Sequence, residues 1–242
     1  MAHMGSYSTA NVLASVKAVL RDTTATADAR LLSDSEITEN ITKGTYRYSH
    51  DRPLEKVVTL TADGTIYTDL PAEFADGFSS ILRLESPLDH IPPQWVDARD
   101  YIIQHGDSNN AAHKIRWTRV APTSGDSIRL FYTTHRSYAA TANQTTVLDH
   151  DHHSVVDLIV SICAGDIGNK YARAHEPILG ADTVDYGSKS KEWADIATMY
   201  MERYRAGIGV AEGEKPAASS FINWDSQPDP SRDYLFHRKM TR

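Results

Sequence analysis

The sequence lacks the residues and runs from which several protein classes are built. It has a single cysteine, Cys163, so neither a disulfide framework nor a cysteine-rich zinc cluster can form. No stretch approaches the roughly 18 continuous apolar residues of a membrane span, so we predict no membrane association. Basic residues are not in excess either: the formal net charge is −7, whereas proteins that wrap nucleic acid carry a dense basic face. What remains is a soluble globular chain, 40% hydrophobic, with room for a sizeable core.

The common catalytic motifs are also absent. There is no Gly-x-Ser-x-Gly, no phosphate-binding loop with Gly-Lys-Ser/Thr, and no Gly-x-Gly-x-x-Gly. Cys163 ends the apolar run 155–163, which indicates a small buried hydrophobe rather than a nucleophile. Gly165 and Gly168 follow it, and we interpret them as glycines that allow close helix packing. We therefore predict no catalytic residues, no cofactor and no enzymatic activity.

One run of residues does carry metal-binding chemistry: Asp149, His150, Asp151, His152 and His153. Histidine and carboxylate are metal ligands, so an incidental metal site or a metal-dependent hydrolase using His150–His153 are two interpretations. The third is a helix N-cap, in which Asp149 or Asp151 accepts backbone N–H bonds at the positive helix end. No glutamate follows a histidine at the spacing that a general base needs. We favour the cap and predict no metal site.

Apolar residues recur with the helical period in four segments, before and after the middle of the chain. The second segment opens with the capping box Ser33–Glu36. The third is hydrophobic nearly all round, which is typical of a buried helix. The predicted helices cover residues 8–21, 33–50, 151–174 and 183–206.

Between these helix pairs the period changes to that of strands. Turn sequences containing Gly64 and Gly125 each separate two alternating segments, so each pair is predicted to form a hairpin. Arg116 and Trp117 should point to opposite faces of their strand. The predicted strands are 57–60, 65–68, 80–84, 114–120 and 127–133.

These elements predict an α+β fold: an antiparallel four-helix bundle with a β-rich insert between helices two and three, followed by an extended C-terminal tail. Residues 8–53 and 139–209 would form the discontinuous bundle, and residues 54–138 the insert. We interpret residues 1–7 as disordered or tag-derived, and residues 210–242 as an extended arm.

The order of these elements, together with the sequence of several segments, resembles that of the head-to-tail connector (adaptor) proteins of tailed bacteriophages. The resemblance spans about residues 8–209 and consists of packing and turn patterns rather than a chemical signature. The segments most alike are 69–74 (DLPAEF), 81–85 (ILRLE), 152–173, 182–190 (DTVDYGSKS) and 200–205 (YMERYR).

The resemblance implies a structural subunit of the phage neck. Such proteins assemble as a twelve-fold ring beneath the portal, extend the DNA channel and receive a downstream tail or neck protein. DNA would pass through the lumen without specific binding. The protein would be made in the host cytoplasm and reside in the virion at the head–tail junction. An alternative is an oligomeric protein- or glycan-binding module of a virion or another assembly.

The C-terminal arm combines an acidic stem with a basic, aromatic tip. Since connector families often reach the portal with C-terminal extensions, one interpretation is that these side chains dock onto the portal; the other is a loose tail with chance aromatics. The candidate portal-binding residues are Phe221, Trp224, Tyr234, Phe236, Arg238 and Lys239.

A second group of candidates consists of arginines on or near the second predicted hairpin. We interpret them as an ion-pair rim between neighbouring subunits, with DNA contact and ordinary surface as alternatives. They are Arg116, Arg119, Arg129 and Arg136.

Overall fold

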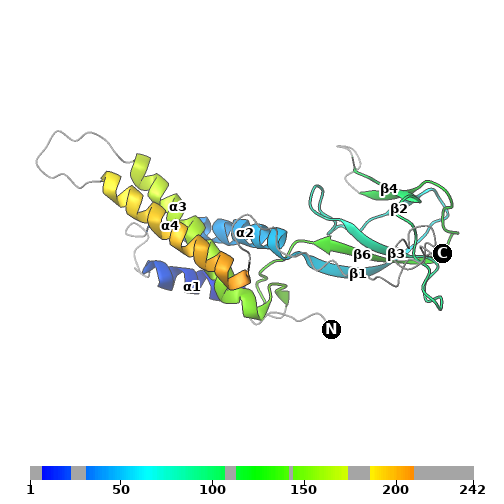
Figure 1. The fold of residues 1–242 in the computed structure, drawn as a ribbon, viewed down its shortest axis with the longest axis horizontal. Helices are drawn as coiled ribbons and strands as arrows, with labels where there is room; N and C mark the ends of the chain where they lie inside the picture. Colours follow the sequence, from blue (N-terminus) through cyan, green and yellow to red (C-terminus); the bar gives the residue numbers. More distant parts are fainter. Residues whose placement is uncertain (1–6, 23–30, 107–112, 142–143, 174–185, 210–242) are drawn as a thin grey trace, which may run out of the picture.

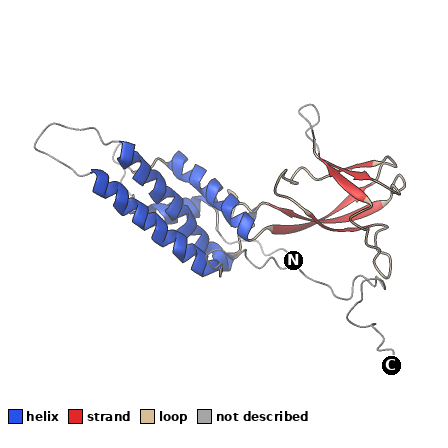
Figure 2. Cartoon of the chain, turned by 45° about the horizontal axis from the view of Figure 1, so that its top comes forward, coloured by secondary structure: helices blue, strands red, loops and turns tan. Residues whose placement is uncertain are grey.

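The computed structural model describes residues 7–22, 31–106, 113–141, 144–173 and 186–209. The molecule is elongated, with its helices at one end and its strands at the other (Figures 1 and 2). We call these parts the helical unit and the β unit. The helical unit consists of α1 (Thr9–Leu20), α2 (Asp34–Asp51), the short 3-10 helix η3 (Asp149–Asp151), α3 (His152–Arg173) and α4 (Tyr186–Ile208).

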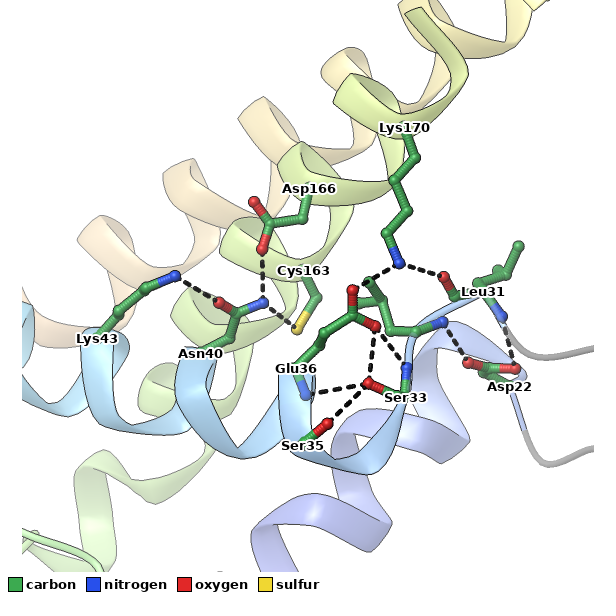
Figure 3. Close-up of polar contacts among 11 residues, drawn as sticks. Asp22, Leu31, Ser33, Ser35, Glu36, Asn40, Lys43, Cys163, Asp166 and Lys170 are labelled. Atoms are coloured by element: carbon green, nitrogen blue, oxygen red, sulfur yellow. Dashed lines mark hydrogen bonds and ion pairs between the residues drawn. The ribbon is translucent and has the colours of Figure 1, made fainter. Parts of the chain in front are cut away.

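The start of α2 shows why a local sequence signal suffices to begin a helix. The Ser33 side chain accepts a hydrogen bond from the Glu36 N–H, and the Glu36 carboxylate accepts one from the Ser33 N–H at 2.7 Å, which confirms the capping box. The same carboxylate pairs with Lys170 of α3 at 2.8 Å (Figure 3). Lys170 and Ser33 together hold the pKa of Glu36 at about 2. The cap thus also ties α2 to α3.

Helix α3 is the centre of the helical unit, because α1, α2 and α4 all pack against it. Its burial continues around the helix, as the hydrophobic sequence predicts. Gly168 permits a close approach to α4, since a Cβ there would lie 3.3 Å from the Ser190 carbonyl oxygen. The same interpretation is wrong for Gly165, which has open space beside it.

The β unit contains two antiparallel three-stranded sheets, ordered β1-β6-β3 and β2-β5-β4. Both contribute to one apolar core, which contains Leu84 and Leu130 from the first sheet and Ile115 and Trp117 from the second. This core is separate from that of the helices. The strands are β1 (Leu54–Thr61), β2 (Tyr67–Asp69), β3 (Ile81–Glu85), β4 (Tyr101–Gln104), β5 (Lys114–Trp117) and β6 (Ser127–Thr134).

The class is α+β, but the predicted architecture, a four-helix bundle carrying a β-rich insert, is wrong. The chain has four helices and two small sheets, and the sheets bury a core of their own. The physical reason on the helical side is α3. A helix that is apolar nearly all round has to bury all of its sides. The other three helices therefore pack around α3 instead of forming a bundle of four equivalent helices.

The two predicted hairpins are also wrong. Strand β1 pairs with β6 along its whole length, from Leu54–Thr134 to Thr61–Ser127, and β2 pairs with β5. Each glycine turn instead carries the chain from one sheet to the other. The two turns meet: the Gly125 N–H donates to the Ala62 carbonyl oxygen at 2.8 Å. A turn sequence specifies a reversal, while the burial of the inner faces of the two sheets against each other decides which strands become neighbours.

Within the described ranges, no helix is long and apolar enough to cross a membrane. The arm predicted at residues 210–242 and the first six residues lie outside the described part of the chain.

Candidate functional site

Two chain segments connect the helical unit to the β unit, and Arg136 binds both of them. Its guanidinium donates to the carbonyl oxygens of Arg52 and Pro53, at 2.7 and 3.2 Å, and to that of Thr146. Arg136 is only 9% exposed, and its guanidinium lies 5.9 Å from the centroid of the Tyr48 ring. Burial lowers the pKa of Arg136, but guanidinium groups remain charged in proteins. We call this junction, with the ion pair described next, the joint.

Asp151 forms the second half of the joint. Its side chain is buried and accepts a hydrogen bond from the Tyr48 hydroxyl at 2.6 Å and one from Arg52 at 3.0 Å. Arg52 also donates to the carbonyl oxygen of Ile208 at the end of α4. Burial, followed by the hydrogen bond to Asp151, raises the pKa of Tyr48 far above its ordinary value. The sequence predicted a helix cap at Asp149 or Asp151; the structure gives Asp151 these two side-chain partners at the end of α2.

The histidines of this segment lie in different surroundings. His152 is 3% exposed, its ring stacks on Tyr7 with centroids 3.5 Å apart, and its Nδ1 lies 3.1 Å from the Tyr138 hydroxyl. His150 and His153 are exposed, and His150 Nε2 lies 3.2 Å from Arg52. Among the residues that the structure describes, no group of three or more His, Cys, Asp or Glu side chains could hold a metal ion.

The buried His152 makes stability depend on pH. Burial, with a smaller contribution from His153, lowers its pKa from 6.5 to about 4. Between these values the unfolded chain binds a proton that the folded chain does not, so the free energy of unfolding should fall as the pH is lowered. The loss is at most about 3 kcal/mol, since one pKa unit corresponds to about 1.4 kcal/mol. Urea unfolding from pH 7.5 to 4.5 measures it.

The matched control for this prediction is His90→Gln, because His90 is exposed in the β unit. His152→Gln should make the pH profile less steep, and His90→Gln should leave its slope unchanged. Part of the slope should remain in His152→Gln, because burial also lowers the pKa of His135. An equally steep profile in His152→Gln would show that another group titrates in this window.

The structure places the four candidate arginines in different surroundings, and their role between subunits stays a prediction. Arg136 is buried in the joint. Arg129 donates to Glu85 at 3.1 Å and to Asp89 at 2.9 Å, and Arg119 lies 3.2 Å from Asp100. Arg116 is exposed on the outer face of β5, opposite the buried Trp117, as the strand alternation predicts. The six candidate portal-binding residues of the C-terminal arm lie outside the described residues.

Sequence reasoning missed a buried polar contact between α2 and α3. Asn40, 1% exposed, donates to Asp166 at 2.8 Å and lies 3.5 Å from the Cys163 sulfur (Figure 3). The only sequence signal is an asparagine on the apolar side of an amphipathic helix. A buried amide that is hydrogen-bonded fixes how two helices align, because any shift leaves it without a partner.

The thiol at this contact should be unreactive in the folded protein. Cys163 is completely buried, and burial raises its pKa to about 11. Compared with the ordinary value of 9.0, this shift reduces the thiolate fraction about 100-fold at neutral pH. A colorimetric thiol reagent should therefore detect no thiol in native protein and one per chain after denaturation. Rapid labelling of the native protein would contradict the burial.

No protein-family model matches the sequence, and neither does any curated protein. Two solved assemblies contain chains to which this structure is similar. A chain from the neck of an empty GTA particle computed with C6 symmetry is 16% identical, with 75% of this chain and 87% of that chain covered and a TM-score of 0.29. A chain from the neck of a native GTA particle computed with C12 symmetry is 13% identical, with 66% and 82% covered and a TM-score of 0.23. TM-scores this low do not establish a shared fold.

Proposed function

We propose that this chain is a non-catalytic structural subunit of a phage neck. It forms a ring that joins the portal to the tail and extends the DNA channel. The connector-like segments of the sequence support this role, and the joint is the structural observation that carries it. A subunit between two larger assemblies has to keep its binding surfaces at a fixed distance and angle.

The joint meets this requirement through partly buried, charge-assisted hydrogen bonds. Arg136 binds backbone carbonyls of both connecting segments, and Arg52 links Asp151 to the end of α4. Such bonds are stronger than neutral ones and are directional. Asp151 and His152 are both buried and held by neighbouring side chains, which favours a structural role for them over a catalytic one.

Copies of the chain bind one another in the ring, the C-terminal arm binds the portal through its aromatic and basic residues, and a downstream tail or neck protein binds the opposite side. DNA passes through the lumen of the ring without specific binding. The mature protein is located in the virion at the head–tail junction.

Size measurement and imaging test the ring. Chromatography with light scattering and negative-stain microscopy should find a closed ring of about twelve copies, alone or on added portal rings. The arm is tested with a chain that ends at Gly209, which should join portal rings more weakly than the full chain. A monomer or dimer that ignores the portal would overturn the proposal and favour an oligomeric binding module. Equal portal binding by the shortened chain would move the anchor from the arm to the rest of the chain.

A further inference from the structure

The β unit exposes an unusual share of the large apolar side chains. Seven of the ten that are exposed in the described chain belong to it, which sets it apart from the helical unit. Scattered exposed hydrophobes are normal, whereas apolar surfaces with polar borders mark interaction sites. Those on or beside the first sheet are Val57, Leu82, Ile91 and Trp95, and those on or beside the second are Ile66, Ile102 and Val120.

The first surface includes a loop that follows β3, which we call the 86–95 loop. Its ends are closed by a hydrogen bond from the Ser86 N–H to the Gln94 carbonyl oxygen at 3.1 Å. Ile91 lies within it, 94% exposed and followed by two prolines. Loops with closed ends and their own internal contacts are frequently functional.

An ion-pair network with one buried member, Glu85, holds this loop in shape. Glu85 is 3% exposed at the base of the loop, and its carboxylate accepts from Arg129 at 3.1 Å and from the Asp89 N–H at 3.2 Å. Arg129 also donates to the Asp89 carboxylate. The loop therefore needs little further ordering when a partner binds Ile91, which reduces the entropic cost of association.

The apolar surface continues from the loop onto the first sheet. The Trp95 ring, 39% exposed, lies 5.8 Å from the Phe131 ring, and the Arg83 guanidinium lies 5.5 Å from the Trp95 centroid. Val57, 57% exposed, is opposite Phe131 in the strand register. These contacts make one continuous surface of the 86–95 loop and the neighbouring sheet.

The second surface is the outer face of the β2-β5-β4 sheet. Arg116 lies at its centre, opposite Tyr67 on one side and Ile102 on the other in the strand register. Ile102 is 55% exposed, and Arg116 is exposed between these apolar neighbours. The next row of the same face is polar: Lys114 lies between Asp69 and Gln104 in the strand register, 3.2 Å from the Asp69 carboxylate. Arg116 thus has apolar neighbours and a polar border, while the loop of the first surface carries Asp89, 72% exposed.

We propose that these two surfaces bind each other between copies of this chain, in a head-to-tail contact. The 86–95 loop of one copy contacts the Tyr67–Arg116–Ile102 face of the next; this inference rests on the proposed ring. The two sheets share a core, so their outer faces point away from each other. A ring needs such a pair of different, oppositely directed surfaces, whereas a two-fold dimer uses one surface twice. Arg129 is shared by the carboxylates of Glu85 and Asp89, which leaves one excess negative charge at the loop, and this charge fits Arg116 on the other surface.

Cysteine cross-linking in the full-length chain tests the contact. The double variant Ile91→Cys/Ile102→Cys places one thiol on each surface, and the buried Cys163 does not interfere. After mild oxidation, non-reducing electrophoresis should show a ladder of trimers and larger species. The control Ile91→Cys/Thr59→Cys has its second thiol exposed on the first sheet and should give no ladder. Unchanged thermal unfolding of both variants confirms that they fold.

Each other outcome has a distinct meaning. Covalent dimers of the single variant Ile91→Cys would show that the loop meets itself, which overturns the head-to-tail contact. Closed rings in the microscope without a ladder would place the contact elsewhere and leave the proposed function standing. Monomers without a ladder, in the presence of portal rings as well, would overturn both.

Discussion

Replacing Arg136 with alanine is expected to lower the free energy of unfolding by about 3–5 kcal/mol. The guanidinium is buried and donates to the carbonyl oxygens of Arg52, Pro53 and Thr146. After the substitution these oxygens lose their charged donor in a partly buried site. A buried polar group left without a partner costs about 1–3 kcal/mol, so several together give this total.

Urea unfolding measures the loss, with Arg99→Ala as the matched control. Arg99 is an exposed arginine of the β unit outside both proposed contact surfaces, so its replacement should change the free energy of unfolding by less than about 0.5 kcal/mol. Arg136→Lys keeps the charge but not the planar fork, and should recover only part of the loss. A loss below about 1 kcal/mol for Arg136→Ala would show that the carbonyls find other donors.

Small-angle X-ray scattering tests whether the same variant changes the arrangement of the two units. If the joint holds the two units in line, Arg136→Ala should broaden the distribution of distances between them, while Arg99→Ala should not. This measurement separates a joint that fixes geometry from one that only adds stability.

The helices follow from local signals, which is why the sequence predicts them closely. The Ser33–Glu36 capping box sets the start of α2, and the all-round apolar pattern predicts a buried α3. Both signals act within a few residues of the chain. Their success does not extend to how the helices are arranged, because that depends on which faces meet.

The strands show the limit of local reasoning. The alternation of Arg116 and Trp117 correctly predicts which side is buried, but the turn at Gly64 joins β1 to a strand in the other sheet. Turn residues report backbone conformation, and pairing is decided by the core that both sheets share. The same applies to the joint. Nothing near Asp151 in the sequence indicates that Tyr48 and Arg52 will bind it.

At the contact between α2 and α3, substitutions at Gly44 and Ile159 should have non-additive effects on stability. A Cβ at Gly44 would lie 2.7 Å from Cγ1 of Ile159, a residue of α3 that is completely buried. Gly44→Ala gains up to about 1 kcal/mol in helix propensity but forces this overlap, which costs about 1–3 kcal/mol, so a net loss is expected. Gly165→Ala is the matched control, because nothing lies within 4 Å of a Cβ there and only the propensity gain remains.

Ile159→Ala alone should cost about 2–5 kcal/mol, since it leaves a cavity at the centre of the helical unit. In the double variant Gly44→Ala/Ile159→Ala, the methyl group added at position 44 enters that cavity, and the overlap is gone. The double variant should therefore lose less than the sum of the single losses, by at least about 1 kcal/mol. Urea unfolding of the four proteins completes the cycle. Losses that simply add would mean that α2 and α3 do not touch at this point, and α3 would then lack cover from α2 on this side.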